Sequence, residues 1–148
     1  MTTENTENFN GLISALAKAA GLDSLDFEEG GVFFALDEVM GVSITTADAE
    51  DVGVDLLVAT IIVDEAPADA EALTFLLEQN YLGVGAGDGS FAIDHETGVA
   101  VLFRAFSLPM DAETFVDAFS RLAGAARAAR DRLVNTREMP DPMSGFIV

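Results

Sequence analysis

The side chains that perform most enzyme chemistry are scarce in this chain. It contains no cysteine and one histidine, His95, which excludes thiolate nucleophiles, disulfides, cysteine metal sites and multi-histidine metal sites within one subunit. His95 lies between Asp94 and Glu96, but a serine triad also needs a positioned serine. The candidates, Ser90 and Ser107, lie near predicted strand ends and have no nucleophile elbow around them. We therefore interpret His95 as an exposed turn residue.

Two segments resemble ligand loops but depart from them at decisive positions. Residues 83–89 are rich in glycine, but a phosphate-binding loop follows a strand and opens a helix, whereas this segment is expected to follow a helix and lead into a strand. Residues 48–53 begin like a calcium loop, but Val52 and Ala59 stand where oxygen ligands are required. Acids adjacent in sequence form no catalytic dyad, because neighbours on a strand point to opposite faces. The sequence therefore predicts no catalytic residue, no metal site and no cofactor, and the chain is not expected to be an enzyme.

The composition indicates a folded and strongly acidic protein. Half of the 148 residues are apolar and 11 are Phe, which excludes a disordered chain, and the length fits one domain. The net charge is −19, and residues 1–103 contain 20 acids but a single basic residue, Lys18. Such a surface repels phosphate backbones and anionic lipid, so we expect neither nucleic acid nor membrane as a partner. Residues 1–10 lack the basic and apolar parts of a signal peptide, and we expect a cytoplasmic location.

Hydrophobic periodicity predicts three helices and five strands. Apolar residues at helical spacing predict a helix at about 7–20, with Thr6 as its N-cap, and another from the N-cap Asp111 to about residue 134. Between them the sequence predicts strands at 32–36, 42–46 and 54–63, a helix at 68–81, a flexible glycine-rich connection at 83–89, a strand near 91–93, and a strand at 99–106.

The order α-β-β-β-α-β-β-α predicts an α+β fold. All five strands can pair antiparallel through short connections, and the helices then pack on one face of the sheet. The helical pattern stops at Asn135, so we expect one domain at residues 1–134 and a flexible C-terminal tail at 135–148.

The strand at 54–63 is apolar on both faces except at Asp55 and Thr60. A strand with one solvated face should alternate, so we expect its second face to be covered as well. The sheet has more apolar positions than three helices would cover, namely Phe33, Phe34, Leu57, Ile61 and Val63. They indicate either a well-filled core or a protein–protein surface, since monomers seldom expose large apolar patches.

Four segments, taken in order, resemble one protein family. Residues 9–22 are similar to its opening apolar helix, and residues 54–67 to an apolar strand that ends at a proline. Residues 72–94 resemble its "LL.AN" helix, its glycine-rich reversal and its "LGLD" strand, and residues 94–111 resemble its "D..TG.V.L....LPLD" hairpin and helix start. Over about residues 9–134 the chain resembles the class I type III secretion chaperones, the Tir-chaperone-like family.

The resemblance implies a non-enzymatic cytoplasmic chaperone that acts in virulence as a homodimer. Its partner would be a type III secreted effector, whose N-terminal non-globular segment it would keep soluble and secretion-competent. The family layout and the surplus apolar faces suggest that the effector contacts Leu12, Leu16, Phe33, Phe34, Val42, Ile44, Leu57 and Ile61. They suggest a dimer interface at Leu73, Leu76, Leu77, Tyr81, Phe91 and Leu102.

Two other functions agree with the sequence. One is a small-ligand-binding or regulatory domain of the same fold that is unconnected with secretion. The other is an acidic inhibitor of a basic protein, suggested by the negative charge of residues 1–103, and it would show a strong salt dependence of association.

Overall fold

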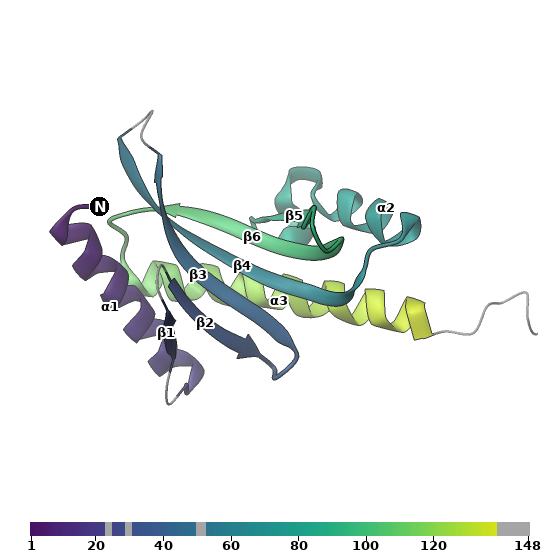
Figure 1. Ribbon diagram of the computed structural model, residues 1–148, viewed down its shortest axis with the longest axis horizontal. Coiled ribbons are helices and arrows are strands. Elements are labelled where there is room, and N and C mark those ends of the chain that lie inside the picture. Colours follow the sequence, from purple (N-terminus) through teal and green to yellow (C-terminus); the bar gives the residue numbers. More distant parts are fainter. Residues whose placement is uncertain (23–24, 29–30, 50–52, 139–148) are drawn as a thin grey trace, which may run out of the picture.

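The computed structural model describes residues 1–22, 25–28, 31–49 and 53–138 (Figure 1). No helix in these described segments is both long and apolar enough to span a bilayer. The elements in chain order are α1 (Thr3–Ala20), β1 (Asp26–Glu28), β2 (Gly31–Leu36), β3 (Met40–Ala49), β4 (Val54–Pro67), α2 (Ala70–Gln79), the 3₁₀ helix η1 (Tyr81–Ala86), β5 (Ser90–Ile93), β6 (Val99–Ser107) and α3 (Ala112–Glu138).

The sheet is antiparallel throughout, with strand order β1-β2-β3-β4-β6-β5. The five predicted strands are all present, and the α+β fold with helices on one face is confirmed. A short sixth strand, β1, adds to β2. Its sequence, Asp-Phe-Glu, is too short to show the alternation by which strands are recognised.

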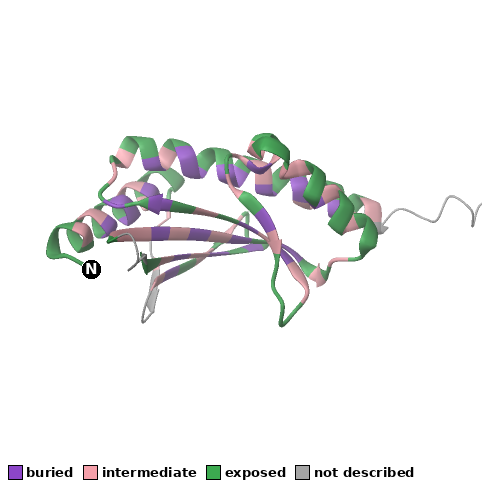
Figure 2. Ribbon diagram, turned by 90° about the horizontal axis from the view of Figure 1, so that it is seen from above, coloured by how far each residue is buried: buried purple, intermediate pink, exposed green. Residues whose placement is uncertain are grey.

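Helices α1 and α3 lie together on one side of the sheet (Figures 1 and 2). The core fills the layer between them and the sheet. Because side chains alternate along a strand, each strand sends every second residue into this layer. The largest fully buried side chains there are Leu12 and Ile13 of α1, Phe115 and Leu122 of α3, and Val32, Met40, Ile44, Leu57, Ile61, Val63 and Leu102 of the strands or their ends.

Helix α1 starts earlier than its apolar stripe predicts. The N-cap is Thr2 and not Thr6, since Thr2 has extended backbone and its hydroxyl accepts the N–H of Asn5 at 3.1 Å. Polar residues in the first two turns also join α1 to distant parts of the chain. The amide of Asn8 donates to the carbonyl of Met110 at 2.8 Å and accepts the Met110 N–H at 2.9 Å. This pair links α1 to the connection between β6 and α3.

Helix α3 begins as predicted after Asp111, whose carboxylate accepts the N–H of Thr114 at 3.0 Å. It continues to Glu138, four residues past the predicted boundary at residue 134. The first part of the predicted tail is therefore helical, and its remainder, residues 139–148, lies outside the described residues.

Helix α2 is shorter than the predicted helix at 68–81, because Asp69 caps it by accepting the N–H of Ala72 at 2.8 Å. The segment predicted as a flexible connection, residues 83–89, overlaps η1, whose C-cap is Gly87. Gly87 has a φ of +58°, and a Cβ there would lie 2.6 Å from the carbonyl oxygen of Arg121. Glycine is therefore required at this position for both conformation and space.

Candidate functional site

The residue most suited to catalysis, His95, does not lie in a cluster of catalytic side chains among the described residues. His95 is exposed in the turn between β5 and β6. The carboxylate of Asp94 accepts the N–H groups of Glu96 at 2.8 Å and of Thr97 at 3.2 Å, and these bonds lower the pKa of Asp94. Asp94 thus stabilises the turn. No group of three or more His, Cys, Asp or Glu in the described segments is arranged to hold a metal ion.

The face of the sheet opposite α1 and α3 carries no charged residue on β2, β3, β5, β6 and residues 54–62 of β4, at the positions whose burial is described. We call it the open face. In a chain of net charge −19, an uncharged surface that spans five strands is unusual. Its members are Gly31, Phe33 and Ala35 of β2, Gly41, Ser43, Thr45 and Ala47 of β3, Val54, Leu56, Val58, Thr60 and Ile62 of β4, Val99, Val101, Phe103, Ala105 and Ser107 of β6, and Ser90 and Ala92 of β5.

The strand register arranges the open face in rows. One row runs Phe33, Ser43, Thr60, Phe103, so that two aromatic rings flank two small hydroxyl side chains. The next row includes Ile62, which pairs with Val101. Phe33 and Phe103 are each 37% exposed and Ile62 is 40% exposed. Figure 2 shows helices on one side of the sheet only, so no helix in the described segments covers this face.

Sequence reasoning identified Phe33 but missed the rest of this surface. The signal was present, since the strand at 54–63 is apolar on both faces and its second face was expected to be covered. The residues that carry that second face are Leu56, Val58 and Ile62. The prediction chose Leu57, Ile61 and Val63 as the surplus, but all three are fully buried under the helices.

Six of the eight residues predicted to contact an effector are core residues, namely Leu12, Leu16, Val42, Ile44, Leu57 and Ile61. The fold brings them together, but their positions on α1 and on the strands turn them into the layer beneath the helices. Their side chains are therefore not exposed as a groove would require. Phe33 lies on the open face, and Phe34 is half-buried with its ring centroid 6.2 Å from that of Phe119. Among the eight, accessibility favours Phe33 as a contact.

The residues predicted for a dimer interface divide in the same way. Leu76, Phe91 and Leu102 are buried, because they face the core from α2, β5 and β6. Leu73, Leu77 and Tyr81 are 38%, 70% and 76% exposed. Leu77 and Tyr81 line a shallow apolar hollow with Thr74 and Glu78. Leu82 and Val84 of η1, which the prediction did not include, are at least 80% exposed.

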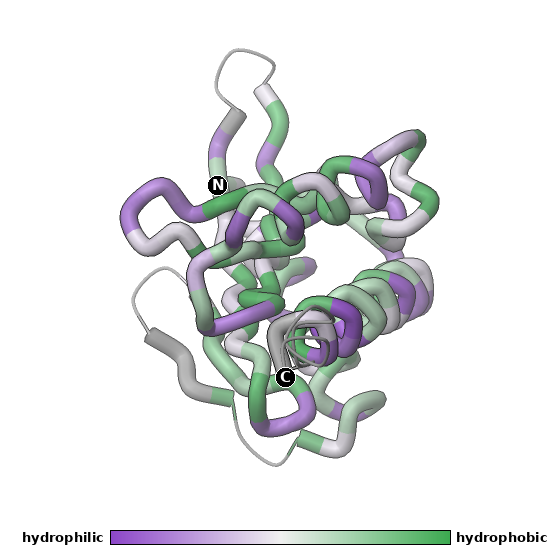
Figure 3. Tube along the Cα trace, turned by 90° about the vertical axis from the view of Figure 1, so that its right-hand side faces the viewer, coloured by the Kyte–Doolittle hydropathy of each residue, from purple (hydrophilic) through white to green (hydrophobic). Residues whose placement is uncertain are grey.

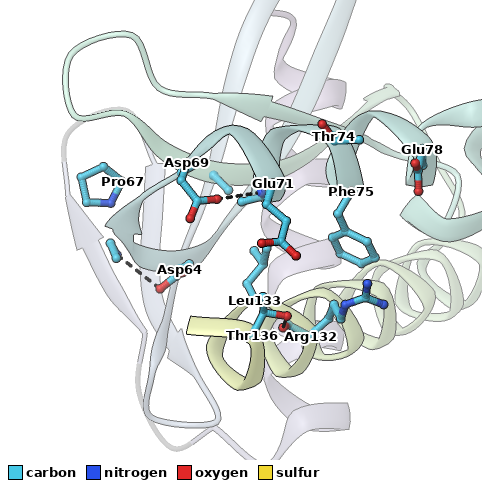
Figure 4. Close-up of a pocket in the computed structure, with 14 residues that line it drawn as sticks. Asp64, Pro67, Asp69, Glu71, Thr74, Phe75, Glu78, Arg132, Leu133 and Thr136 are labelled. Atoms are coloured by element: carbon cyan, nitrogen blue, oxygen red, sulfur yellow. Dashed lines mark hydrogen bonds between the residues drawn. The ribbon is translucent and has the colours of Figure 1, made fainter. Parts of the chain in front are cut away.

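A cavity of about 500 Å³ lies between α2, the end of β4 and the last turns of α3 (Figure 4). Most of its ionisable groups are acidic, and they include Asp64, which is 7% exposed and accepts the N–H of Ala66 at 3.2 Å. Arg132 points into the same space from α3, with its guanidinium carbon 5.0 Å from the ring centre of Phe75. This contact is a cation–π interaction.

Arginines of α3 join the helix to the acidic part of the chain. Arg127 binds Asp37, in the turn between β2 and β3, through two hydrogen bonds of 2.7 and 3.1 Å. These bonds lower the pKa of Asp37 and raise that of Arg127. Arg130 donates to the carbonyl of Val63 at 3.1 Å and to Glu65 at 3.3 Å. In Figure 3 hydrophilic segments gather at the turns and along α3, whereas the strands are largely apolar.

Several solved structures share this fold. A chain of the ExsC–ExsE complex has a TM-score of 0.61 at 22% identity, covering 88% of this chain and 96% of that chain. The Yersinia pestis type III secretion chaperone SycH, in complex with a stable fragment of YscM2, has a TM-score of 0.58 at 16% identity, covering 82% and 98%. The heterodimeric ExoU–SpcU complex of the Pseudomonas aeruginosa type III secretion system has a TM-score of 0.54 at 22% identity, covering 82% and 93%.

At these identities the structures show the fold alone. A search of curated protein sequences gave no match. The family model of the Tir chaperone protein (CesT) family, however, matches residues 11–130, which is most of the chain. The chain belongs to the Tir chaperone protein (CesT) family.

Proposed function

We propose that this protein is a non-enzymatic cytoplasmic chaperone that binds the N-terminal, non-globular segment of a type III secreted effector and keeps it soluble and secretion-competent. Membership of the CesT family supports this function, as do relatives of the same fold that were solved together with partner proteins. The observation that carries the proposal is the open face, an uncharged surface on a strongly acidic chain.

The open face suits an extended apolar partner. A partner segment that lacks its own fold must be ordered on binding, at a cost of about 2–5 kcal/mol. Apolar contacts with side chains such as Phe33, Ile62 and Phe103 offset that cost at about 25 cal/mol per Å² of apolar surface removed from water. The acidic remainder of the surface keeps the complex dispersed, because net charge opposes aggregation.

The proposed assembly is a homodimer that uses the exposed side of α2. Two chains of net charge −19 repel each other, so their contact requires surfaces that are poor in carboxylates. Leu77 and Tyr81 offer an apolar surface with one carboxylate, Glu78, beside them. We expect Leu77→Asp to convert the dimer to a monomer at micromolar concentration in sedimentation velocity, with an unchanged circular dichroism spectrum. A wild-type protein that sediments as a monomer would contradict the dimer.

The effector site is tested at Phe33. A pull-down from the source cell, followed by mass spectrometry, identifies the partner, and its N-terminal segment is then titrated against variants. We expect Phe33→Asp to weaken binding at least tenfold, or about 1.4 kcal/mol, while the fold is retained. The matched control is Val39→Asp, which places the same charge at an exposed apolar residue in the turn between β2 and β3, and it should change binding less than twofold. Equal loss in both variants would contradict the site.

The cavity beside Arg132 favours a second candidate function, the binding of a small ligand. Its volume of about 500 Å³ lies in the range of small-molecule sites, about 300–1,000 Å³. Its acids favour a cationic ligand. A thermal-shift screen of small cations, with Arg132→Ala for comparison, would support this function if a compound raised Tm in the wild type and lost that effect on substitution.

A further inference from the structure

The strand β5 forms one end of the sheet, with β6 on its inner side. In an antiparallel ladder, successive residues direct their backbone groups alternately toward the neighbouring strand and away from it. The N–H of Asp94 donates to the carbonyl of Val99 at 3.0 Å, so Ser90 and Ala92 direct their backbone groups toward β6 as well. Phe91 and Ile93 therefore direct theirs outward, to the side where a further strand would join.

The side chain of Asn80 binds both outward backbone groups of Phe91. The Phe91 N–H donates to Oδ1 of Asn80 at 2.7 Å, and the Phe91 carbonyl accepts from Nδ2 of Asn80 at 3.0 Å. These are the two bonds that a residue on an added strand would make with Phe91. Helix α2 holds Asn80 in place. The backbone N–H of Asn80 donates to the carbonyl of Leu76 at 3.1 Å, and Leu76 is buried.

We propose that Asn80 determines which edge of the sheet an extended segment can join. Its side-chain amide substitutes for a neighbouring strand at β5 and closes that edge, so that a joining segment is directed to the opposite end of the sheet, where β1 pairs with β2 alone among the described strands. Natural proteins protect sheet edges against unwanted pairing. Protection matters here because Leu77 and Tyr81 are exposed beside Asn80 in sequence and would add apolar contact to a strand that entered.

The extended partner in this proposal rests on the proposed function, whereas the closure of the β5 edge is a property of this chain alone. The experiment therefore uses a probe that needs no effector, a capped peptide that copies residues 89–94. The variant is Asn80→Ala. The matched control is Asn8→Ala, which removes the same two-bond amide contact at the backbone of Met110, away from any strand edge.

We expect the amide of Phe91 to exchange with solvent at least tenfold faster in Asn80→Ala than in the wild type. We also expect this variant to bind the peptide at least tenfold more tightly than the wild type or Asn8→Ala, with NMR shift changes centred on residues 90–93. If Asn80→Ala fails to fold, Asn80→Asp serves instead, because it keeps the acceptor for the Phe91 N–H but loses the donor to the Phe91 carbonyl, and its gain should be at least threefold.

Two results overturn the proposal. In one, the Asn80 substitutions leave the affinity for the peptide at the wild-type value; in the other, Asn8→Ala raises that affinity as much as Asn80→Ala does. A wild-type protein that captures no secreted partner would contradict the proposed function. It would not change the peptide results, so the role of Asn80 would still be decided by them.

Discussion

The two faces of the sheet carry the same kinds of apolar residue but differ in how far these residues are buried. On the helix-covered face, Leu57, Ala59 and Ile61 of β4 are fully buried. On the open face, the intervening residues Leu56, Val58 and Ile62 are just as apolar, but they stay partly exposed. The helices α1 and α3 account for the first set and nothing in the chain's own described helices covers the second. An apolar strand therefore does not show that both of its faces are buried within a single chain.

The largest difference between the faces is expected at the adjacent leucines of β4. Leu57→Ala should lower the free energy of unfolding by about 2–5 kcal/mol, because it leaves a cavity in a packed core. Leu56→Ala should lower it by about 1 kcal/mol or less, since a partly exposed side chain loses few contacts. Urea denaturation of both variants at equal, low protein concentration measures the contrast. Equal losses would contradict the assignment of Leu56 to the partly exposed face.

A smaller difference is expected at Phe33 and Phe34, which are adjacent on β2. Phe34→Ala should cost about 1–3 kcal/mol, below the value for a fully buried ring, because Phe34 is half-buried against Phe119. Phe33→Ala should cost about 0.5 kcal/mol or less in the free chain. Thermal and urea unfolding of the two variants provide the test. A greater loss for Phe33 would break the assignment of the two rings to opposite faces.

The smallest effect is expected where α3 meets the turn between β2 and β3. Asp37→Asn removes the charge that Arg127 binds and suits the positive φ of 54°. It should cost about 0.2–1 kcal/mol at pH 7, as for other exposed ion pairs. Since the pKa of Asp37 is lowered below 3.8 in the folded state, this contribution is present above pH 3.8 and is lost as the pH falls below it.

The control for this ion pair is Asp88→Asn, because Asp88 also has a positive φ and lies 3.6 Å from Arg121. The longer contact should make its effect smaller than that of Asp37→Asn. Urea titrations at pH 7 and pH 3 compare both variants with the wild type. A difference between Asp37→Asn and the wild type that grew below pH 3.8 would contradict the role of the carboxylate.

The elements could be predicted where local chemistry decides them. The stripe of Phe9, Leu12, Ile13 and Leu16 marked α1, and the cap residue Asp111 marked the start of α3, which the structure confirms. The start of α1 and the strand β1 were missed, because they depend on contacts between distant residues. Thr2 and Asn5, for example, both approach the carboxylate of Asp55, a contact that no local pattern reveals.

The candidate site was harder to predict than the fold. Periodicity shows that residues share a face, but it does not show which face the helices cover. The prediction assigned Phe33 and Leu57 to one effector-contacting surface, although the two lie on opposite faces of the sheet. The role of Asn80 also depends on a contact with Phe91 across the η1 segment, which composition and spacing do not indicate.

The link between α1 and the far end of the chain has a consequence for synthesis. Asn8 binds Met110, 102 residues later, and the inner side of α1 packs against α3. During synthesis α1 therefore has no completed layer to enter until α3 has been made. The apolar strands between the two helices are expected to stay exposed in that interval.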